Sequence, residues 1–165
     1  MSRTLIAIRH AKSDWSRRVD DHARPLNGRG QRDAPRIGEW LADHGFVPDD
    51  AAVSSALRTR QTWAAISDRL PSTPSEYVED ELYNASANHI LDVARAARVG
   101  IRAIVGHNPG IGIFMQQIVA ERPSKHRFDD IPTGSTLVVR FQEQDWHQID
   151  WRSGEVLGFV TPHEF

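Results

Sequence analysis

The order of short apolar runs and helix-like segments constrains the fold of this 165-residue chain more than any other feature. Residues 4–9, 51–54 and 101–105 are short apolar runs, as in buried strands. The segments 33–44, 57–70 and a stretch that follows Ser86 as N-cap carry apolar residues at helical spacing. Strands that alternate with helices in this way build parallel sheets with helices on both faces.

The C-terminal third predicts a different edge to the sheet. Residues 135–141, 146–151 and 156–160 are expected strands, and Ser153-Gly154 predicts a hairpin or meander between the last two. Before them, Asn108 as N-cap and Pro109 as first residue predict a helix to about Glu121. The expected fold is a three-layer α/β/α sandwich with a mostly parallel central sheet and an antiparallel edge. At this length we expect a single domain, residues 1–165.

Composition excludes several classes of protein. The chain has no cysteine, which removes disulfides, thiolate nucleophiles and cysteine-bound metals, and is compatible with a cytoplasmic setting. Its 20 basic and 22 acidic residues argue against a nucleic-acid partner. The apolar run at residues 5–8 is too short for a signal peptide or a membrane span. We therefore expect a soluble cytoplasmic protein that binds neither nucleic acid nor membrane.

Polar residues follow each of the three expected parallel strands, where open sheets of this kind bind their ligands. Arg9 and His10 end the first strand, Arg58 lies shortly after the second, and His107 ends the third. Arginine side chains and helix N-termini bind phosphate, and a neutral imidazole can carry a phosphoryl group covalently. The four residues therefore predict a phosphoryl-transfer site.

Longer motifs surround these residues in five segments: Arg9–Trp15 (RHAKSDW), Arg24–Gly30 (RPLNGRG), Ser54–Thr62 (SSALRTRQT), Gly106–Gly110 (GHNPG) and Pro132–Gly134 (PTG). In this order they resemble the histidine phosphatase superfamily, which includes the cofactor-dependent phosphoglycerate mutases. The first segment resembles the small SixA-type phosphohistidine phosphatases in particular. The resemblance spans nearly the whole chain and implies a phosphoglycerate mutase-like fold.

The resemblance implies a role for each matching residue. His10 would be the nucleophile and would form a phosphohistidine intermediate that water then hydrolyses. The residues implied to surround the phosphate are Arg9, Arg58 and His107, with Ser13 and Asn27 adding hydrogen bonds near the pocket. Such a mechanism requires no metal and no other cofactor. The chain also lacks the HExxH, EF-hand and Walker motifs.

One segment departs from the pattern of the larger members, which carry a carboxylate that protonates the leaving alkoxide. Here the corresponding stretch is residues 80–86, and Asn84, which falls near the acid's position, cannot donate a proton as an acid. Asp80 and Glu81 are the possible substitutes. Without an acid, we expect alkyl phosphates to be poor substrates and phosphohistidine, whose leaving imidazole is less basic, to be favoured.

The short polar segment 121–132 predicts an open site that admits a phosphorylated side chain of another protein. Lys125, His126 and Arg127 are candidates to contact an acidic partner, and Trp15 is the tryptophan expected to border the site. We therefore expect a phosphatase acting on a phosphohistidine-bearing protein. Two alternatives remain: an esterase or mutase acting on a small phosphorylated metabolite, and a non-catalytic phosphoprotein-binding module.

Overall fold

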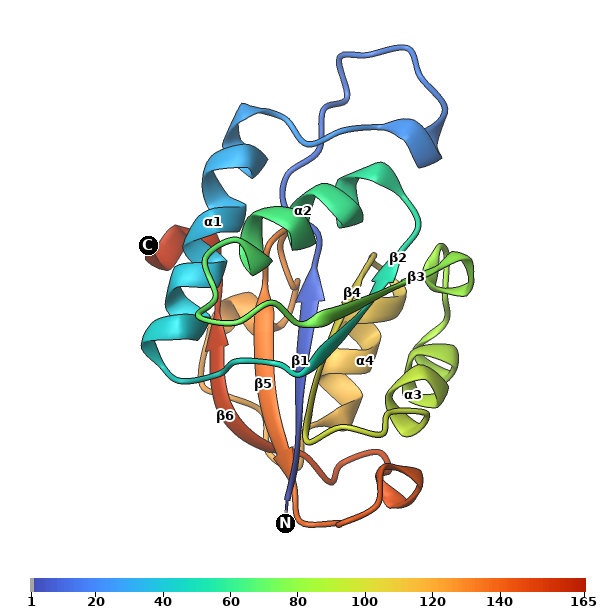
Figure 1. The fold of residues 1–165 in the computed structure, drawn as a ribbon, viewed down its shortest axis with the longest axis vertical. Coiled ribbons are helices and arrows are strands. Elements are labelled where there is room, and N and C mark those ends of the chain that lie inside the picture. The colour runs from blue at the N-terminus through green and yellow to red at the C-terminus, as the bar shows by residue number, and fades with distance from the viewer. Residues whose placement is uncertain (1) are drawn as a thin grey trace.

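A six-stranded sheet forms the centre of the computed structural model, which describes residues 2–165 (Figure 1). Its strands are β1 (Arg3–Arg9), β2 (Asp50–Ser54), β3 (Ser75–Glu79), β4 (Ile101–Gly106), β5 (Thr136–Phe141) and β6 (Glu155–Val160). They lie in the order β3-β2-β4-β1-β5-β6. The first four in this order are parallel, and β5 runs antiparallel to both β1 and β6. The predicted parallel sheet with an antiparallel edge is confirmed.

Two pairs of helices cover the two faces of this sheet (Figure 1). They are α1 (Gly28–Asp43) with α2 (Leu57–Ser67), and α3 (Ala87–Arg95) with α4 (Gly110–Ile118). The side chains of β1 alternate between the two resulting cores. Leu5 and Ala7 pack on the α3 and α4 side, whereas Ile6 and Ile8 pack on the α1 and α2 side. The three-layer architecture is therefore as predicted.

Five short 3-10 helices lie in the connections: η1 (Asp21–Ala23), η2 (Asp80–Leu82), η3 (His126–Phe128), η4 (Trp146–Gln148) and η5 (Pro162–Glu164). Of these, η1 and η2 flank the candidate site described below. Across residues 2–165, no helix combines the length and the apolar character needed to cross a membrane.

The boundaries of the first two predicted helices differ from expectation. Helix α1 begins at Gly28 rather than residue 33, because the Asn27 side chain accepts a hydrogen bond from the Gly30 amide at 2.9 Å and caps the helix. Helix α2 ends at Ser67, earlier than the predicted residue 70. Strand β3 ends at Glu79 and is followed directly by η2. Ser86 caps α3 as predicted, by accepting from the His89 amide.

The predicted start and end of α4 are wrong. Asn108 does not cap the helix, because its side-chain amide donates instead to the Ile131 carbonyl at 3.1 Å. Pro109 occupies the N-cap position, and the helix ends at Ile118 instead of near residue 121. Val119 already pairs with Gly154 in an isolated bridge, which turns the chain out of the helix.

The predicted strand at residues 146–151 is also wrong. Trp146 opens η4, where its ring is buried and its indole N–H donates to the Val99 carbonyl at 2.6 Å. The Asp145 carboxylate caps the same turn by accepting from the His147 amide at 3.0 Å. The hairpin expected at residues 153–154 is therefore absent, and β5 pairs directly with β6 across the connection 142–154.

Candidate active site

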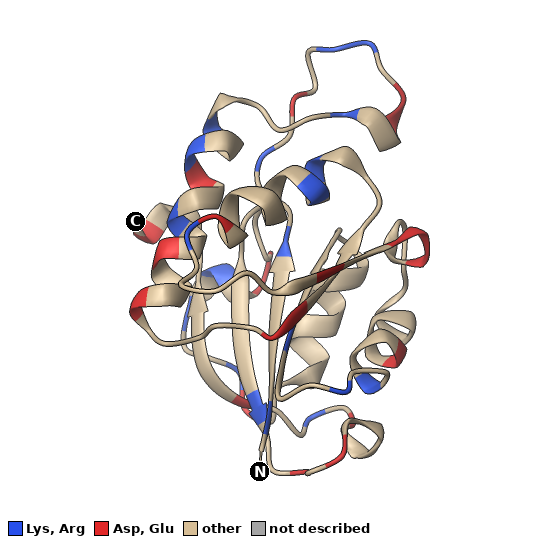
Figure 2. Ribbon diagram, in the orientation of Figure 1, with Lys and Arg blue, Asp and Glu red and all other residues tan. Residues whose placement is uncertain are grey.

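The carboxyl ends of β1, β2 and β4 meet at one edge of the sheet, and the segment between β1 and α1 rises beyond them (Figure 1). A cavity of about 300 Å³ lies at this edge. The structure brings together the four predicted residues Arg9, His10, Arg58 and His107 in its lining. Lys and Arg positions accordingly gather at the end of β1, the start of α2 and the loop above them (Figure 2).

The His10 ring is held in one tautomer. Its Nδ1 lies 2.7 Å from the Ala11 carbonyl oxygen, which can only accept a hydrogen bond. The proton therefore resides on Nδ1, and Nε2 keeps its lone pair. Burial, which leaves the residue 6% exposed, lowers the pKa of His10 to about 3, and the neighbouring His107, Arg58 and Arg9 act in the same direction. The imidazole is thus a neutral nucleophile at neutral pH.

His107 faces His10 across the cavity, with ring centroids 5.3 Å apart. Its Nε2 forms a 2.7 Å hydrogen bond with the Ser54 hydroxyl at the end of β2. Its Nδ1 is buried and has no partner among residues 2–165. Burial, followed by the charge of Arg58, lowers the pKa of His107 to about 4. A second neutral imidazole therefore offers a free ring nitrogen beside the first.

Two predicted arginines bring positive charge to the cavity, Arg9 from β1 and Arg58 from α2. Arg58, in the first turn of α2, donates from Nη1 to the Asp21 carbonyl at 2.7 Å and from Nη2 to the Asp21 carboxylate at 3.1 Å. Arg9, at the end of β1, donates from Nη1 to the Ile131 carbonyl at 2.9 Å, and burial lowers its pKa. The Nε atoms of both arginines are buried without partners within residues 2–165. These free donors suit an anion.

Sequence reasoning missed a third arginine in the cavity. Arg24 is 6% exposed, and its Nη2 lies 3.0 Å from Asp21 Oδ1. Its Nε and Nη1 are buried and unpartnered in the described part of the chain. The signal was available, because Arg24 opens the motif at residues 24–30. An arginine is a stronger phosphate ligand than the Asn27 chosen from the same motif.

A carboxylate at the cavity was missed as well. Asp21, in η1, contacts Arg24 and Arg58, and its Oδ2 accepts a 2.6 Å hydrogen bond from the Tyr83 hydroxyl. The Tyr83 hydrogen bond and the two arginines lower the pKa of Asp21, so its carboxylate is ionised at neutral pH. Tyr83 also packs edge-on against the His107 ring at 5.6 Å. Neither residue was assigned a role from the sequence. The two meet through a tertiary contact between positions 62 residues apart, which no local motif encodes.

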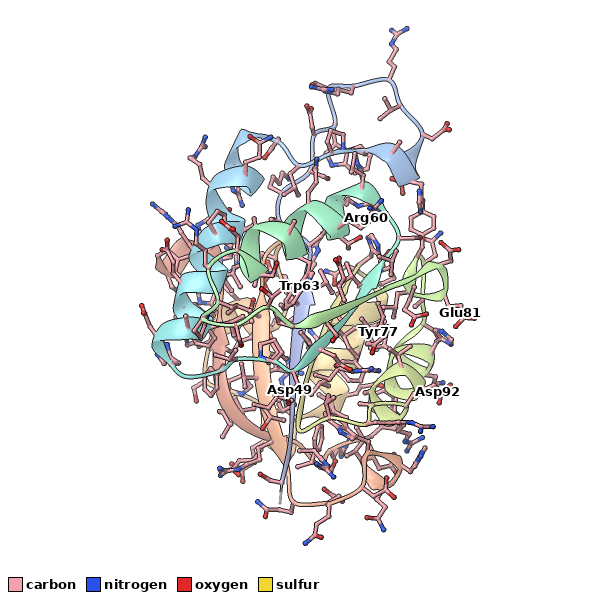
Figure 3. All side chains as sticks on the ribbon, in the orientation of Figure 1. Asp49, Arg60, Trp63, Tyr77, Glu81 and Asp92 are labelled. Carbon is pink, nitrogen blue, oxygen red and sulfur yellow. The ribbon has the colours of Figure 1, made fainter. Side chains whose placement is uncertain are left out.

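The remaining predicted residues divide between the cavity and its surroundings. Ser13 lines the cavity, but Asn27 does not, because its side chain caps α1. Asp80 and Glu81 lie in η2 and are absent from the described lining. Figure 3 shows Glu81 at the outer edge of the molecule, and its side chain is 75% exposed. Both carboxylates therefore lie outside the described lining, on the 3-10 turn after β3, and an acid role for either stays a prediction.

Two other residues discussed from the sequence, Asn84 and Trp15, border the cavity. Asn84 lines it in a left-handed conformation with φ of 60°. Trp15 lines it as well, as expected. By contrast, Lys125 and Arg127 lie outside the lining, where Lys125 pairs with Glu164 at 2.7 Å and Arg127 with Asp130 at 3.4 Å.

The described residues 2–165 contain no group of three or more histidine, aspartate or glutamate side chains arranged to hold a metal ion. The independence from metal expected from the sequence stays a prediction, which a chelator tests directly. The residues present instead supply a neutral nucleophilic imidazole, a second imidazole and three arginines around one cavity. This set has the donors and the nucleophile that phosphoryl transfer requires, and it lies on a three-layer α/β sandwich.

Comparison with known proteins gives the family. A family model described as histidine phosphatase superfamily (branch 1) matches residues 5–86. The uncharacterized protein Rv1276c of Mycobacterium tuberculosis is 32% identical over 168 residues, which cover 94% of this chain and 99% of that protein. The chain belongs to the histidine phosphatase superfamily.

Solved structures agree with this assignment. The protein assigned as phosphohistidine phosphatase SixA from Nakamurella multipartitia has a TM-score of 0.81 and 29% identity, over 98% of this chain and 97% of that one. A phosphoglycerate mutase from Plasmodium falciparum shares the fold with a TM-score of 0.61 at 15% identity, over 97% of this chain and 89% of that one. The expected phosphoglycerate mutase-like fold is thereby confirmed.

Proposed function

We propose that this protein is a phosphatase that moves a phosphoryl group from its substrate to Nε2 of His10 and then to water. One observation carries the proposal: the 2.7 Å hydrogen bond from Nδ1 of His10 to the Ala11 carbonyl leaves the lone pair on Nε2, in a residue that lines a cavity rich in arginine. A nucleophile that is already neutral needs no base to activate it. Membership of the superfamily supports the same chemistry.

In the first step, Nε2 of His10 attacks phosphorus. The Nε2–P bond forms as the bond to the leaving group breaks, and the leaving group keeps the electron pair and takes a proton from solvent. The free donors of Arg9, Arg24 and Arg58 bind the phosphoryl oxygens, where charge collects during transfer. The Ala11 carbonyl stabilises the positive charge that develops on the His10 ring, because it accepts from Nδ1–H.

In the second step, water attacks the phosphorus of the phosphohistidine. The new P–O bond forms as the Nε2–P bond breaks, the attacking water loses a proton to solvent, and inorganic phosphate leaves. The electron pair returns to Nε2, so His10 regains the tautomer that the Ala11 carbonyl favours. His107 faces His10 at 5.3 Å, and the Ser54 hydroxyl donates to its Nε2, so its unpartnered Nδ1–H donates a hydrogen bond to a phosphoryl oxygen in both steps.

The proposed substrate is phosphohistidine in a partner protein. The cavity offers no ready acid for a leaving alkoxide, since Asn84 cannot donate an acidic proton and Asp21 is ionised. An imidazole leaving group is the same chemical group as the His10 nucleophile, so transfer between the two needs no strong acid. The assignment of the Nakamurella multipartitia protein, which is 29% identical, supports the same substrate class.

Phosphate release from a phosphohistidine-bearing protein tests the proposal. We expect His10→Ala to reduce release to the background rate and Arg58→Ala to reduce kcat/KM by about 10²–10³-fold. The matched controls are His147→Ala and Arg60→Ala, which remove exposed residues outside the cavity lining and should leave release unchanged. Figure 3 marks Arg60 on α2, two positions after Arg58. Undiminished release by His10→Ala would contradict the mechanism.

The same assay separates the alternatives. Release that a chelator abolishes would overturn the predicted independence from metal. Release from small phosphoesters alone would assign the site to a metabolite, and binding of a phosphoprotein without release from any compound would assign it to a non-catalytic module.

A further inference from the structure

Trp15 is a large apolar side chain left in water at the mouth of the active site. Of the large hydrophobic residues described in the chain, it has the highest exposed fraction, 73%, and it lines the cavity together with His10 and Arg58. An indole in this position adds nothing to either core. Tryptophan, with tyrosine and arginine, is enriched among the interface residues that contribute most of the binding energy.

The ring of Trp15 is held in place on one side. The guanidinium carbon of Arg24 lies 3.5 Å from the ring centroid, the geometry of a cation–π contact. Arg24 is itself buried and bound to Asp21, which also binds Arg58. The indole is thus linked by direct contacts to an arginine that we assign to the phosphoryl group.

The backbone around Trp15 is fixed as well. Ser13 pairs with Leu26 in an isolated bridge, and the Asp14 amide donates to the Pro25 carbonyl at 2.8 Å. The Asp14 carboxylate in turn accepts from the Ser16 amide at 2.8 Å. A ring that is already immobilised loses little conformational entropy when a ligand stacks on it. The exposed part of the indole is therefore a preformed contact surface at the cavity mouth.

We propose that Trp15 determines substrate specificity by stacking against a planar ring bonded directly to the phosphoryl group, the imidazole of a phosphohistidine side chain. This inference rests on the proposed function. A ring attached to phosphorus by one bond stays at the mouth of a cavity of about 300 Å³ while Arg9, Arg24 and Arg58 hold the phosphoryl oxygens. Substrates that lack such a ring do not form the contact with Trp15.

The test compares two substrates that both contain a P–N bond. Free phosphohistidine carries the ring, and phosphoramidate does not. The variants are Trp15→Ala and Trp15→Phe, with Val19→Ala as control, because Val19 is a 48% exposed residue of the same loop outside the described lining. For each variant, the measured quantity is its kcat/KM relative to the original protein on each substrate.

We expect Trp15→Ala to lose about tenfold more kcat/KM on phosphohistidine than on phosphoramidate, with the difference residing mainly in KM. Trp15→Phe, which keeps a ring, should restore most of the selectivity, and Val19→Ala should match the original protein on both substrates. Equal losses on the two substrates would mean that Trp15 only supports the loop, and would overturn the proposal, as would no loss on either.

Failure of this inference and failure of the proposed function give different results. Equal losses in Trp15→Ala, with release still dependent on His10, would remove the stacking role and leave the phosphatase in place. If phosphohistidine is not hydrolysed but an aryl phosphate is, with a selective loss in Trp15→Ala relative to phosphoramidate, Trp15 would stack on a ring linked through oxygen, and both the proposed substrate and the inference in its stated form would be overturned.

Discussion

At the scale of single residues, the chemistry of the site depends on where His10 places its proton. Its position at a strand end, before Ala11, was predictable because the strand signal is local. The tautomer was not predictable, because it depends on the 2.7 Å approach of the Ala11 carbonyl to Nδ1 in the folded backbone. Burial adds a second effect that the sequence does not carry, since it holds both His10 and His107 neutral.

The lowered pKa values of His10 and His107 predict a loss of stability in mild acid. In the unfolded chain each histidine takes up a proton below its usual pKa of about 6.5, whereas in the folded state His10 and His107 stay neutral until about 3 and about 4. The unfolded state therefore binds more protons in this interval, and the free energy of unfolding falls as the pH is lowered through it.

Urea unfolding at about pH 7 and about pH 5, in buffers without phosphate, measures this effect. We expect His10→Asn and His107→Asn each to lose about 2 kcal/mol less than the original protein between these two pH values. An unchanged pH dependence in both site variants would contradict the buried neutral histidines.

At the scale of the element, local patterns predicted the site residues that follow strands and missed Arg24 and Asp21, which a loop supplies. Arg9, Arg58 and His107 lie within or directly after a strand or in the first turn of a helix, so their position follows from the neighbouring apolar periodicity. Arg24 and Asp21 lie in the connection between β1 and α1. Contacts with α2, such as Asp21 with Arg58, fix that connection, and no local pattern encodes them.

The close contact between α1 and the segment after β1 gives a prediction at this scale. A Cβ atom at Gly30 would approach the Lys12 carbonyl oxygen to 2.1 Å, whereas one at Gly28 would meet only the end of the Arg32 side chain at 3.4 Å. We therefore expect Gly30→Ala to destabilise the protein by about 1–3 kcal/mol and to lower kcat/KM, because Lys12 belongs to the cavity lining.

Gly28→Ala is the matched control in the same helical turn and should be neutral or slightly stabilising. Urea midpoints and kcat/KM measure both variants. If Gly30→Ala proved as stable and as active as Gly28→Ala, the packing of α1 against the segment that carries His10 would be different from the one described here.

At the scale of the whole molecule, the three layers followed from alternating strands and helices, but the C-terminal edge was only partly predictable. Both β5 and β6 were expected as strands, but the predicted hairpin joined residues 146–151 to β6, whereas β6 pairs with β5. The segment 146–151 looked like a third strand because Trp146, Ile149 and Trp151 are residue types that favour strands. Burial of the Trp146 ring and capping by Asp145 produce a 3-10 turn instead, and both are tertiary or side-chain effects.

The residues that line the cavity predict that the protein selects its substrates by their leaving groups. General acid catalysis contributes about 10²–10⁴-fold, and no protonated carboxyl group is available among the described lining residues. We expect kcat/KM for alkyl phosphates to fall at least about 10²-fold below that for phosphohistidine, and aryl phosphates to lie between them. A kcat/KM for alkyl phosphates comparable to that for phosphohistidine would contradict this prediction. If Asp21→Asn then lost the turnover of alkyl phosphates selectively, Asp21 would be identified as the acid.

The most direct test of the central claim is a search for the phosphoryl group on His10 itself. The protein is mixed with phosphohistidine substrate, quenched in base on the millisecond scale and digested, and the peptides are analysed by mass spectrometry. We predict a transient phosphoryl group, stable to base and labile to acid, on the peptide that contains His10, and its absence in His10→Ala. Phosphate release without any phosphorylated His10, or with an equal yield of phosphate from His10→Ala, would contradict the account.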